Sequence, residues 1–402
     1  MGERVESKKN VYFYCCIGGD LLICAGISKI LKGLDQNYHT VLVLPAHVRV
    51  KGKMERYYHF FDQLEELPYC SFGYNIFKTL PKIVRFLKAL NNIRFAPGSV
   101  CFMFDVYDLT ELLFYRKIRN LKKKIRIRLN ILTAFNNGEL EKNRKELVIK
   151  GTVLKSLYAL PLAHQFFYEY KTRGTNFVGL HSTRTRCDLQ VCIKQSKYQS
   201  VPDQVIRQVN YPPNIFFSGK NEFETQEGLF DKGTQNIILL VDGTIAHQIK
   251  DYWEDTGTMI RKLRMNGYEL FLKDHPLSTV RLQDVITEEV KIIPGKLHIE
   301  ELFLGYKDEI KAICGYGSTA LLTASWLGIH AVDLSALYHF PELLKERFRI
   351  FVSMGENIRT VYSVDQLDNI GQLTDREISL PVSELYQEWE NIMMGQTTNL
   401  AR

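Results

Sequence analysis

Short apolar runs alternate with longer amphipathic segments along most of this chain. In the first half, the apolar runs that predict strands lie at 10–16, 39–44, 100–105 and 125–135. The segments with helical spacing lie at 21–32, 75–90 and 109–119. Within 75–90, Pro81 predicts that the helix proper begins there, because proline fits best in a first turn. The alternation predicts a parallel sheet covered by helices.

The same alternation returns in the second half. Strands are predicted at 236–241, 268–273, 310–314 and 330–334, and helices at 252–265, 300–306, 318–327 and 382–393. Asn266 and Gly267 supply the stop signal of the helix at 252–265. Between the halves, the chain is less regular and rich in Asn, Gln and Pro, which is typical of a connection. We therefore predict a first domain at 1–190, a connection at 191–232, a second domain at 233–375, and a C-terminal helix and tail at 376–402.

Length and composition agree with two globular domains. A chain of 402 residues is longer than one ordinary hydrophobic core accommodates. A composition of 45% hydrophobic and 24% charged residues excludes a disordered chain. The beginning is polar and has no signal-peptide pattern. The apolar stretch 11–31 is interrupted by Gly18, Gly19, Asp20 and Lys29, which favours a strand, turn and helix over a membrane span. Eight cysteines without a CxxC pair predict reduced thiols, no metal site and a cytoplasmic location.

The positive charge is unevenly distributed. The net charge is +7, and eight basic residues without an acid lie between Arg116 and Arg128. This run fits a solvated helix face, or a surface for anionic lipid at the inner membrane or for an acidic glycan. No nucleic-acid-binding motif accompanies it, so we predict no nucleic-acid partner.

Two loops suited to a phosphate follow predicted strands of the second half. The residues concerned are Lys273, His275 and Pro276 in the first loop, and Gly317, Ser318 and Thr319 in the second. Lysine and histidine donate to phosphate oxygens, and hydroxyl and N–H groups at a helix start favour an anion. Taken singly, His275 fits an ordinary strand end and Ser318 an ordinary N-cap. Both loops follow neighbouring strands, and so does the loop at Asp242. Together, the three loops predict a nucleotide-sugar site.

Several short motifs, in this order, resemble the family 52 glycosyltransferases, the bacterial lipooligosaccharide sialyltransferases. More distantly, the chain is similar to the bacterial polysialyltransferases. The matching segments are 10–15, the Phe-Asn-Asn-Gly turn at 135–138, the strand and loop 238–244, Lys-Asp-His-Pro at 273–276, Ile-Glu-Glu-Leu at 299–302, and the serine-threonine segment 318–323. The similarity extends over most of the chain.

The resemblance implies an α/β protein of the GT-B fold, with two Rossmann-like domains facing a central cleft. It implies CMP-sialic acid as donor and inverting transfer to a hydroxyl of a bacterial surface glycan, an acceptor that we expect to be lipid-linked. The acidic segment implies that Glu300 and Glu301 bind the nucleoside. The resemblance also implies that no metal is required. No cofactor is expected, since the CMP-sugar is itself a substrate. A homodimer is left open.

One departure from the family concerns the turn of the first domain. Asn136 and Asn137 replace paired acids there, and an amide cannot act as a general base. We predict that Asp242 is the base, that His275 assists the leaving group, and that Asn137 orients the substrates. The turn at Asn136, Asn137, Gly138 and Glu139 would then form the acceptor-side loop, with Glu139 as the alternative base. The open alternatives are transfer of another sugar (Kdo, another nonulosonate or a hexose), a binding protein without catalysis, and a plain tight turn at Asn136.

Overall fold

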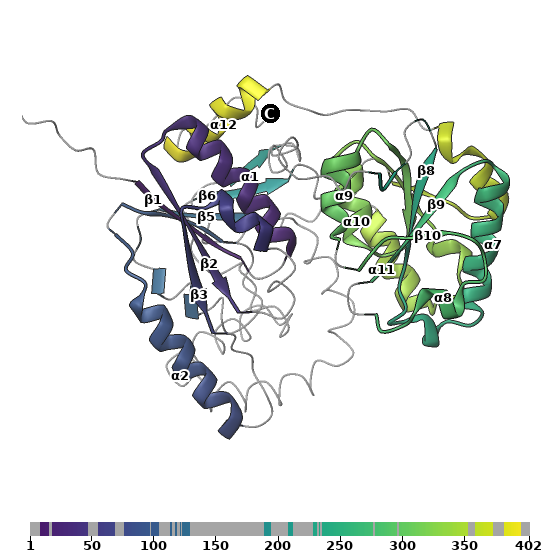
Figure 1. Cartoon of the computed structure of the whole chain (residues 1–402), viewed down its shortest axis with the longest axis horizontal. Helices are drawn as coiled ribbons and strands as arrows, with labels where there is room; N and C mark the ends of the chain where they lie inside the picture. Colours follow the sequence, from purple (N-terminus) through teal and green to yellow (C-terminus); the bar gives the residue numbers. More distant parts are fainter. Residues whose placement is uncertain are drawn as a thin grey trace, which may run out of the picture. The chain divides into compact units, whose positions relative to one another are not determined.

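The chain forms two compact units, which are described one at a time (Figure 1). The first unit comprises Met1–Tyr211 and Pro381–Arg402, and the second comprises Pro212–Leu380. The computed structural model describes residues 9–15, 18–46, 55–68, 76–96, 98–103, 113–114, 117–118, 121, 123–128, 189–193, 208–211, 228–230, 233, 235–275, 278–295, 297–352, 358–372 and 382–394.

Seven parallel strands form the sheet of the first unit, in the order β3-β2-β1-β4-β5-β6-β7. They are β1 (Lys9–Tyr14), β2 (Tyr38–Pro45), β3 (Gln63–Leu67), β4 (Val100–Met103), β5 (Lys123–Arg128), β6 (Leu189–Ile193) and β7 (Gln208–Tyr211). The predicted strands at 10–16, 39–44 and 100–105 are confirmed over their described residues. The segment 191–232, predicted to connect the domains, contains β7 and most of β6, so the first sheet continues into it.

Two long helices of the first unit are α1 (Gly18–Leu34) and α2 (Ile76–Asn92). Helix α2 buries Ile83, Phe86 and Leu90 in a core that also holds Tyr12 and Tyr14 of β1. The prediction that this helix begins at Pro81 is wrong, because α2 begins at Ile76. Pro81 is exposed, so water can satisfy the carbonyl group that loses its hydrogen bond to the proline.

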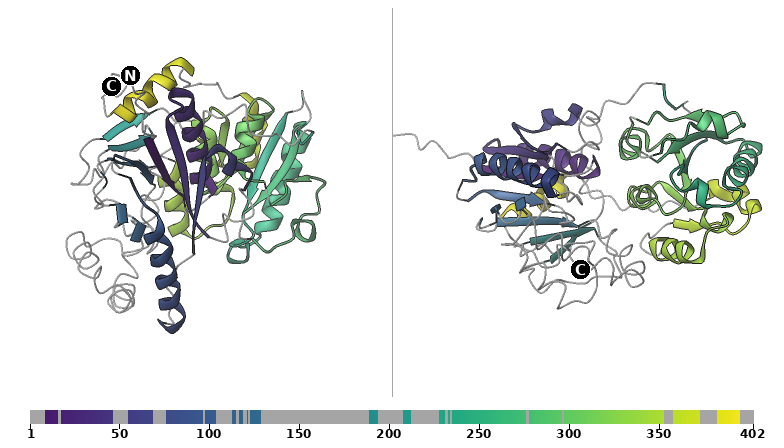
Figure 2. Two further views of the ribbon diagram at one scale, coloured as in Figure 1. Left: turned by 60° about the vertical axis from the view of Figure 1, so that its left-hand side comes forward. Right: turned by 90° about the horizontal axis from the view of Figure 1, so that it is seen from below.

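The last helix of the chain, α12 (Val382–Met394), belongs to the first unit. It contacts α1, as the two further views show (Figure 2). Its Trp389 is fully buried, 6.0 Å from Phe102 between ring centroids, and Phe102 stacks on Phe13 at 5.0 Å. Gly33 of α1 lies where a methyl group would meet the ring of Tyr386. The C-terminal helix therefore completes the core of the first unit.

Six parallel strands form the sheet of the second unit, in the order β10-β9-β8-β11-β12-β13. They are β8 (Asn236–Val241), β9 (Glu269–Asp274), β10 (Lys291–Ile292), β11 (Ile310–Gly315), β12 (His330–Asp333) and β13 (Ile358–Thr360). Every residue of β8 is buried, as expected of a central strand in a parallel sheet.

Helices cover both faces of this second sheet (Figure 1). They are α7 (Tyr252–Met265), α8 (Leu282–Val285), α9 (Ile299–Tyr306), α10 (Thr319–Trp326) and α11 (Glu342–Val352). Shorter 3-10 turns are η4 (Ala246–Gln248), η5 (Ser335–Leu337) and η6 (Val364–Gln372). The predicted stop of α7 is confirmed, since Gly267 follows it with a φ of 81°, which favours glycine.

Candidate functional site

The strand order of the second unit defines where a ligand would bind. The chain proceeds from β8 outward to β9 and β10 on one side, and then crosses to β11, β12 and β13 on the other. In open α/β sheets with such a reversal, ligands bind beyond the carboxyl ends of the strands at the switch point. Here that point lies between β8 and β11. The loops after β9, β8 and β11 are the three that the sequence singled out.

The loop after β8 is a tight turn held by Asp242. Its Oδ1 accepts the backbone N–H of Thr244 at 2.9 Å and the Thr244 hydroxyl at 2.5 Å. This arrangement is an Asx-turn, in which an aspartate side chain stabilises the backbone two residues on. Asp242 is half-buried, and within the described residues its Oδ2 accepts no hydrogen bond. One carboxylate oxygen thus shapes the turn while the other is available to a substrate.

Asp274 joins the loop after β9 to the loop after β8. Its Oδ1 accepts the N–H of Gly243 at 3.0 Å and the N–H of His275 at 2.7 Å. The His275 N–H also faces Val241 O at 3.1 Å, while the residue itself is exposed. The two loops approach so closely that a methyl group on Gly243 would overlap the hydroxyl of Ser278. His275 is therefore held by its backbone and presents its side chain to solvent.

The loop after β11 leads directly into α10. Gly317 has a φ of 54°, in the left-handed region, and a methyl group on it would overlap the ring of Phe348. Ser318 is the N-cap of α10, and its Oγ accepts the N–H of Ala320 at 3.3 Å. Thr319 is the first helical residue and is exposed. The start of α10 therefore offers the positive end of a helix dipole at the switch point.

A pair of buried tyrosines connects the loops after β8 and β11. Tyr252 of α7 accepts the backbone N–H of Asp242 at 2.8 Å, and its Oη lies 2.6 Å from the Oη of Tyr316. Burial raises the pKa of both hydroxyls, so both stay protonated near neutral pH. Tyr316 lies between Gly315 and Gly317 and packs on the rings of Tyr338 and Phe348. The pair fixes the distance between the two loops.

The side chain of Lys273, which the sequence analysis predicts to bind a phosphate, is buried. The residue is only 5% exposed, and its Nζ lies 3.4 Å from Pro294 O. We therefore assign His275 and the start of α10, rather than Lys273, to an anion at this edge.

The two acids expected to bind a nucleoside differ in their surroundings. Glu301 is buried and closes the start of α9, with its Oε2 accepting the His298 N–H at 3.4 Å. Glu300 is half-buried. Burial raises the pKa of its carboxyl above the usual value, although the nearby Lys273 acts in the opposite direction. Glu301 thus serves the helix, and Glu300 is the better candidate for a ligand contact.

The other predicted site residues lie outside the described part of the chain. They are Asn136, Asn137, Gly138, Glu139 and Pro276. Of the basic run 116–128, residues Lys123–Arg128 form β5 between β4 and β6, so the run is not one helix face. Within the described ranges, no three His, Cys, Asp or Glu side chains gather as a metal site.

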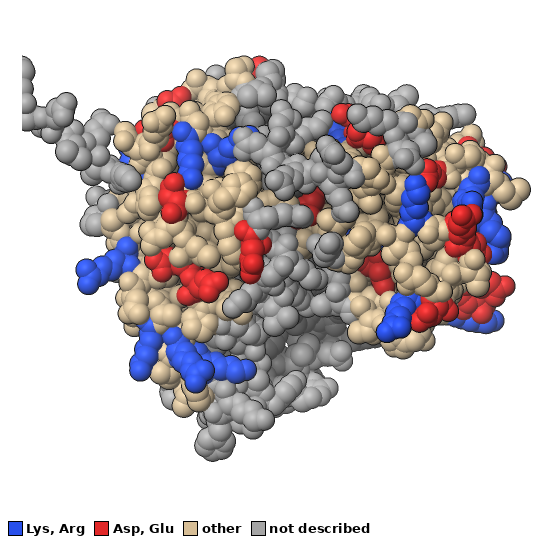
Figure 3. Space-filling model, viewed as in Figure 1, with Lys and Arg blue, Asp and Glu red and all other residues tan. Residues whose placement is uncertain are grey.

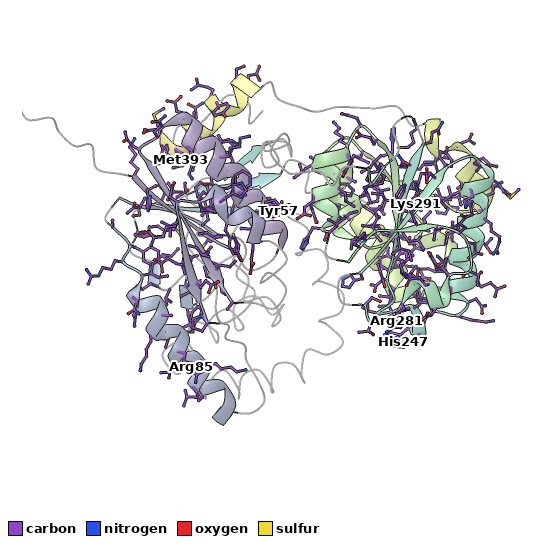
Figure 4. All side chains as sticks on the ribbon, in the orientation of Figure 1. Tyr57, Arg85, His247, Arg281, Lys291 and Met393 are labelled. Carbon is purple, nitrogen blue, oxygen red and sulfur yellow. The ribbon has the colours of Figure 1, made fainter. Side chains whose placement is uncertain are left out.

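The sequence analysis missed Asp274, Tyr252 and Tyr316. Asp274 had a readable signal, because an acid at the end of a buried strand and just before His-Pro favours an Asx-type turn. The tyrosines had none, since their pairing joins residues 64 positions apart. Figure 4 labels His247 and Arg281, which follow the loops after β8 and β9, at the same end of the second unit.

Comparisons with known proteins agree on the fold. No protein-family model and no curated protein matches the sequence. A solved protein of Listeria monocytogenes, assigned as a UDP-N-acetylglucosamine 2-epimerase, is similar with a TM-score of 0.54 and 10% identity, over 97% of this chain and 91% of that one. The UDP-GlcNAc 2-epimerase of Methanocaldococcus jannaschii, solved with UDP-GlcNAc and UDP, is similar with a TM-score of 0.52 and 11% identity, over 96% and 99%.

Identities this low establish the fold alone. Together with the two doubly wound sheets, they show that the chain has the GT-B fold, built from two Rossmann-like units. Neither similar structure is a family 52 glycosyltransferase, so that resemblance stays a prediction. The expected central cleft also stays a prediction.

Proposed function

We propose that this protein is a glycosyltransferase that binds a nucleotide-sugar donor at the switch point of its second sheet. One observation carries the proposal: three loops are tied together at the carboxyl ends of β9, β8 and β11. Gly243 bonds to Asp274, and the tyrosine pair joins Asp242 to the loop of Gly317. An exposed histidine and the start of α10 supply groups that favour an anion.

The donor we favour is CMP-sialic acid. A CMP-sugar carries a single phosphate, and one histidine with one helix start can balance its charge as the sugar departs. The resemblance to family 52 glycosyltransferases supports the same donor. Glu300 would accept hydrogen bonds from ribose hydroxyls or from the cytosine amine, because a carboxylate is an acceptor for both.

The proposed mechanism uses Asp242 and His275. The acceptor hydroxyl attacks the anomeric carbon of the sugar, the bond from that carbon to the phosphate oxygen breaks, and CMP leaves. Oδ2 of Asp242 takes the acceptor proton, while Oδ1 keeps the turn to Thr244 in place. His275 donates to the leaving phosphate. Attack opposite to the leaving group inverts the anomeric centre.

The fold neighbours motivate a second candidate, a protein that acts on a UDP-sugar. The M. jannaschii epimerase is described with UDP-GlcNAc and UDP. A diphosphate needs more positive charge than a single phosphate, and the groups that we assign to the anion, His275 and the start of α10, suit the smaller charge. We therefore rank UDP-sugars second. A binding protein without catalysis is the remaining alternative.

A panel of CMP-, UDP- and GDP-sugars decides between these donors. A ligand that binds only the native state raises the melting temperature by mass action. We expect cytidine nucleotides to raise it and CMP-sialic acid to be turned over in the presence of a glycan acceptor. Stabilisation by UDP-sugars alone would refute the CMP assignment. Stabilisation by CMP-sugars without release of CMP would favour the binding protein.

A further inference from the structure

Helix α2 exposes apolar side chains on the face opposite its buried stripe. Ile83, Phe86 and Leu90 recur at spacings of three and four residues and attach one face of the helix to the sheet. On the outer face, Leu80 is 50% exposed and Val84 is 43% exposed. These two residues are four positions apart and therefore neighbours on the helix surface.

Lys88, four positions after Val84, and Arg85 share the outer face with these apolar residues, and Lys82 lies at the far edge of that face. Lys82, Arg85 and Lys88 are all exposed, and the sequence has no Asp or Glu from residue 75 to 94. Within the described residues, none of the three takes part in an ion pair, in contrast to Lys262 and Arg264 of the second unit. Lys and Arg side chains gather over α2 in Figure 3, and Figure 4 labels Arg85 on it.

The basic surface extends beyond the helix. Nζ of the exposed Lys117 donates to Oδ1 of Asn91 near the end of α2, at 3.3 Å. Lys117 is part of the basic run that the sequence analysis singled out. The structure therefore joins the beginning of that run to α2, whereas its later part forms β5.

We propose that this surface, formed by Leu80, Lys82, Val84, Arg85, Lys88 and Lys117, docks the first unit on an anionic lipid bilayer. No helix within the described residues is long and apolar enough to cross a membrane. In the proposed contact, α2 lies on the interface. The cations meet lipid phosphates, while Leu80 and Val84 reach the boundary of the acyl chains.

The mixture of side chains distinguishes a bilayer from other polyanions. A nucleic acid is bound mainly through phosphate contacts to cations and has no use for exposed Leu80 and Val84. A bilayer uses both kinds of side chain on one helix face. The proposal concerns the first unit and does not depend on which donor the second unit binds.

Flotation of the full-length protein with vesicles tests the proposal. We expect binding to vesicles of phosphatidylcholine with phosphatidylglycerol, none to phosphatidylcholine alone, and weaker binding at high salt. Each cation near an anionic surface changes the partition of the protein between water and vesicles about five-fold. The triple variant Lys82→Glu/Arg85→Glu/Lys88→Glu should therefore bind the vesicles more weakly, on the order of 100-fold or more. Leu80→Ser/Val84→Ser should weaken the binding that persists at high salt.

A matched control separates location from net charge. The control changes three exposed cations of the second unit, Lys250→Glu/Arg264→Glu/Arg349→Glu, which alters the net charge equally and should retain vesicle binding. Equal loss in both triple variants would overturn the proposal, as would wild-type binding that ignores phosphatidylglycerol. Binding of single-stranded RNA but not of vesicles, lost in the α2 variant, would also overturn it. Circular dichroism establishes that each variant is folded.

Discussion

The proposed mechanism gives Asp242 two roles at one side chain, and a conservative substitution separates them. Asparagine keeps an oxygen that accepts the Thr244 N–H, so the turn should persist in Asp242→Asn. It removes the carboxylate that would take the acceptor proton. We expect transfer to be abolished while CMP still raises the melting temperature. Full activity would refute the role of Asp242 and direct attention to Glu139.

His275 is exposed, so removing its side chain takes away little buried surface. If it donates to the leaving phosphate, His275→Ala should lower turnover by a factor on the order of 10² or more. His247→Ala is the matched control, since His247 is also exposed and lies in η4, after the neighbouring strand β8. A His275→Ala variant with wild-type turnover would remove this residue from the mechanism.

Single residues were predictable where the local backbone decides their role. Ser318 reads as an N-cap from its place before an apolar helical run, and the structure places it there. The role of Lys273 stays a prediction, because its surroundings, which include Pro294 O, come from tertiary packing that the sequence does not show. The predicted ligand contact of Glu301 stays a prediction, and in the structure its Oε2 accepts the His298 N–H at the start of α9.

At the scale of elements, Tyr252 and Tyr316 couple the ends of β8 and β11. Tyr252→Phe removes the acceptor of the Asp242 N–H, and an unpaired buried N–H costs roughly 1–3 kcal/mol. The loop can relieve that cost by moving, so we expect donor affinity to fall by about ten-fold. Isothermal titration with CMP measures this change.

Tyr338→Phe serves as the control for the tyrosine pair. Tyr338 packs in the same aromatic cluster, but its hydroxyl bonds to Thr256 Oγ1 at 3.0 Å rather than to a loop. The Tyr338→Phe variant should be less stable than the wild type and should bind the donor with unchanged affinity. Equal effects of the two substitutions on affinity would show that the tyrosine pair acts through general packing alone.

Buried strands were the elements that the sequence predicted best. Every residue of β8 is apolar except Asn236, and its run is bounded by polar residues, so periodicity and length sufficed. Polar β7, with the sequence QVNY, was assigned to a connection, because only its pairing with β6 makes it a strand. Two-residue β10 was missed for the same reason. Tertiary pairing decides these edge strands, and a single sequence does not show it.

At the scale of the whole molecule, the chain ends in the unit in which it began. Trp389 of α12 is fully buried against Phe102, although more than 280 residues separate them in sequence. Each unit has its own hydrophobic core, so the consequences of a change in one core should be confined to that unit.

Trp389→Ala should therefore destabilise the first unit by about 3–5 kcal/mol, the usual cost of truncating a buried tryptophan. Differential scanning calorimetry should show one transition moving to lower temperature. The melting temperature of the second unit should stay unchanged and should still rise when CMP is added, because the proposed site lies at the ends of β8 and β11. Trp253→Ala, a partly buried tryptophan of α7, should move the other transition instead. If Trp389→Ala lowers the melting temperatures of both transitions equally, the two units do not unfold independently, which would contradict the prediction.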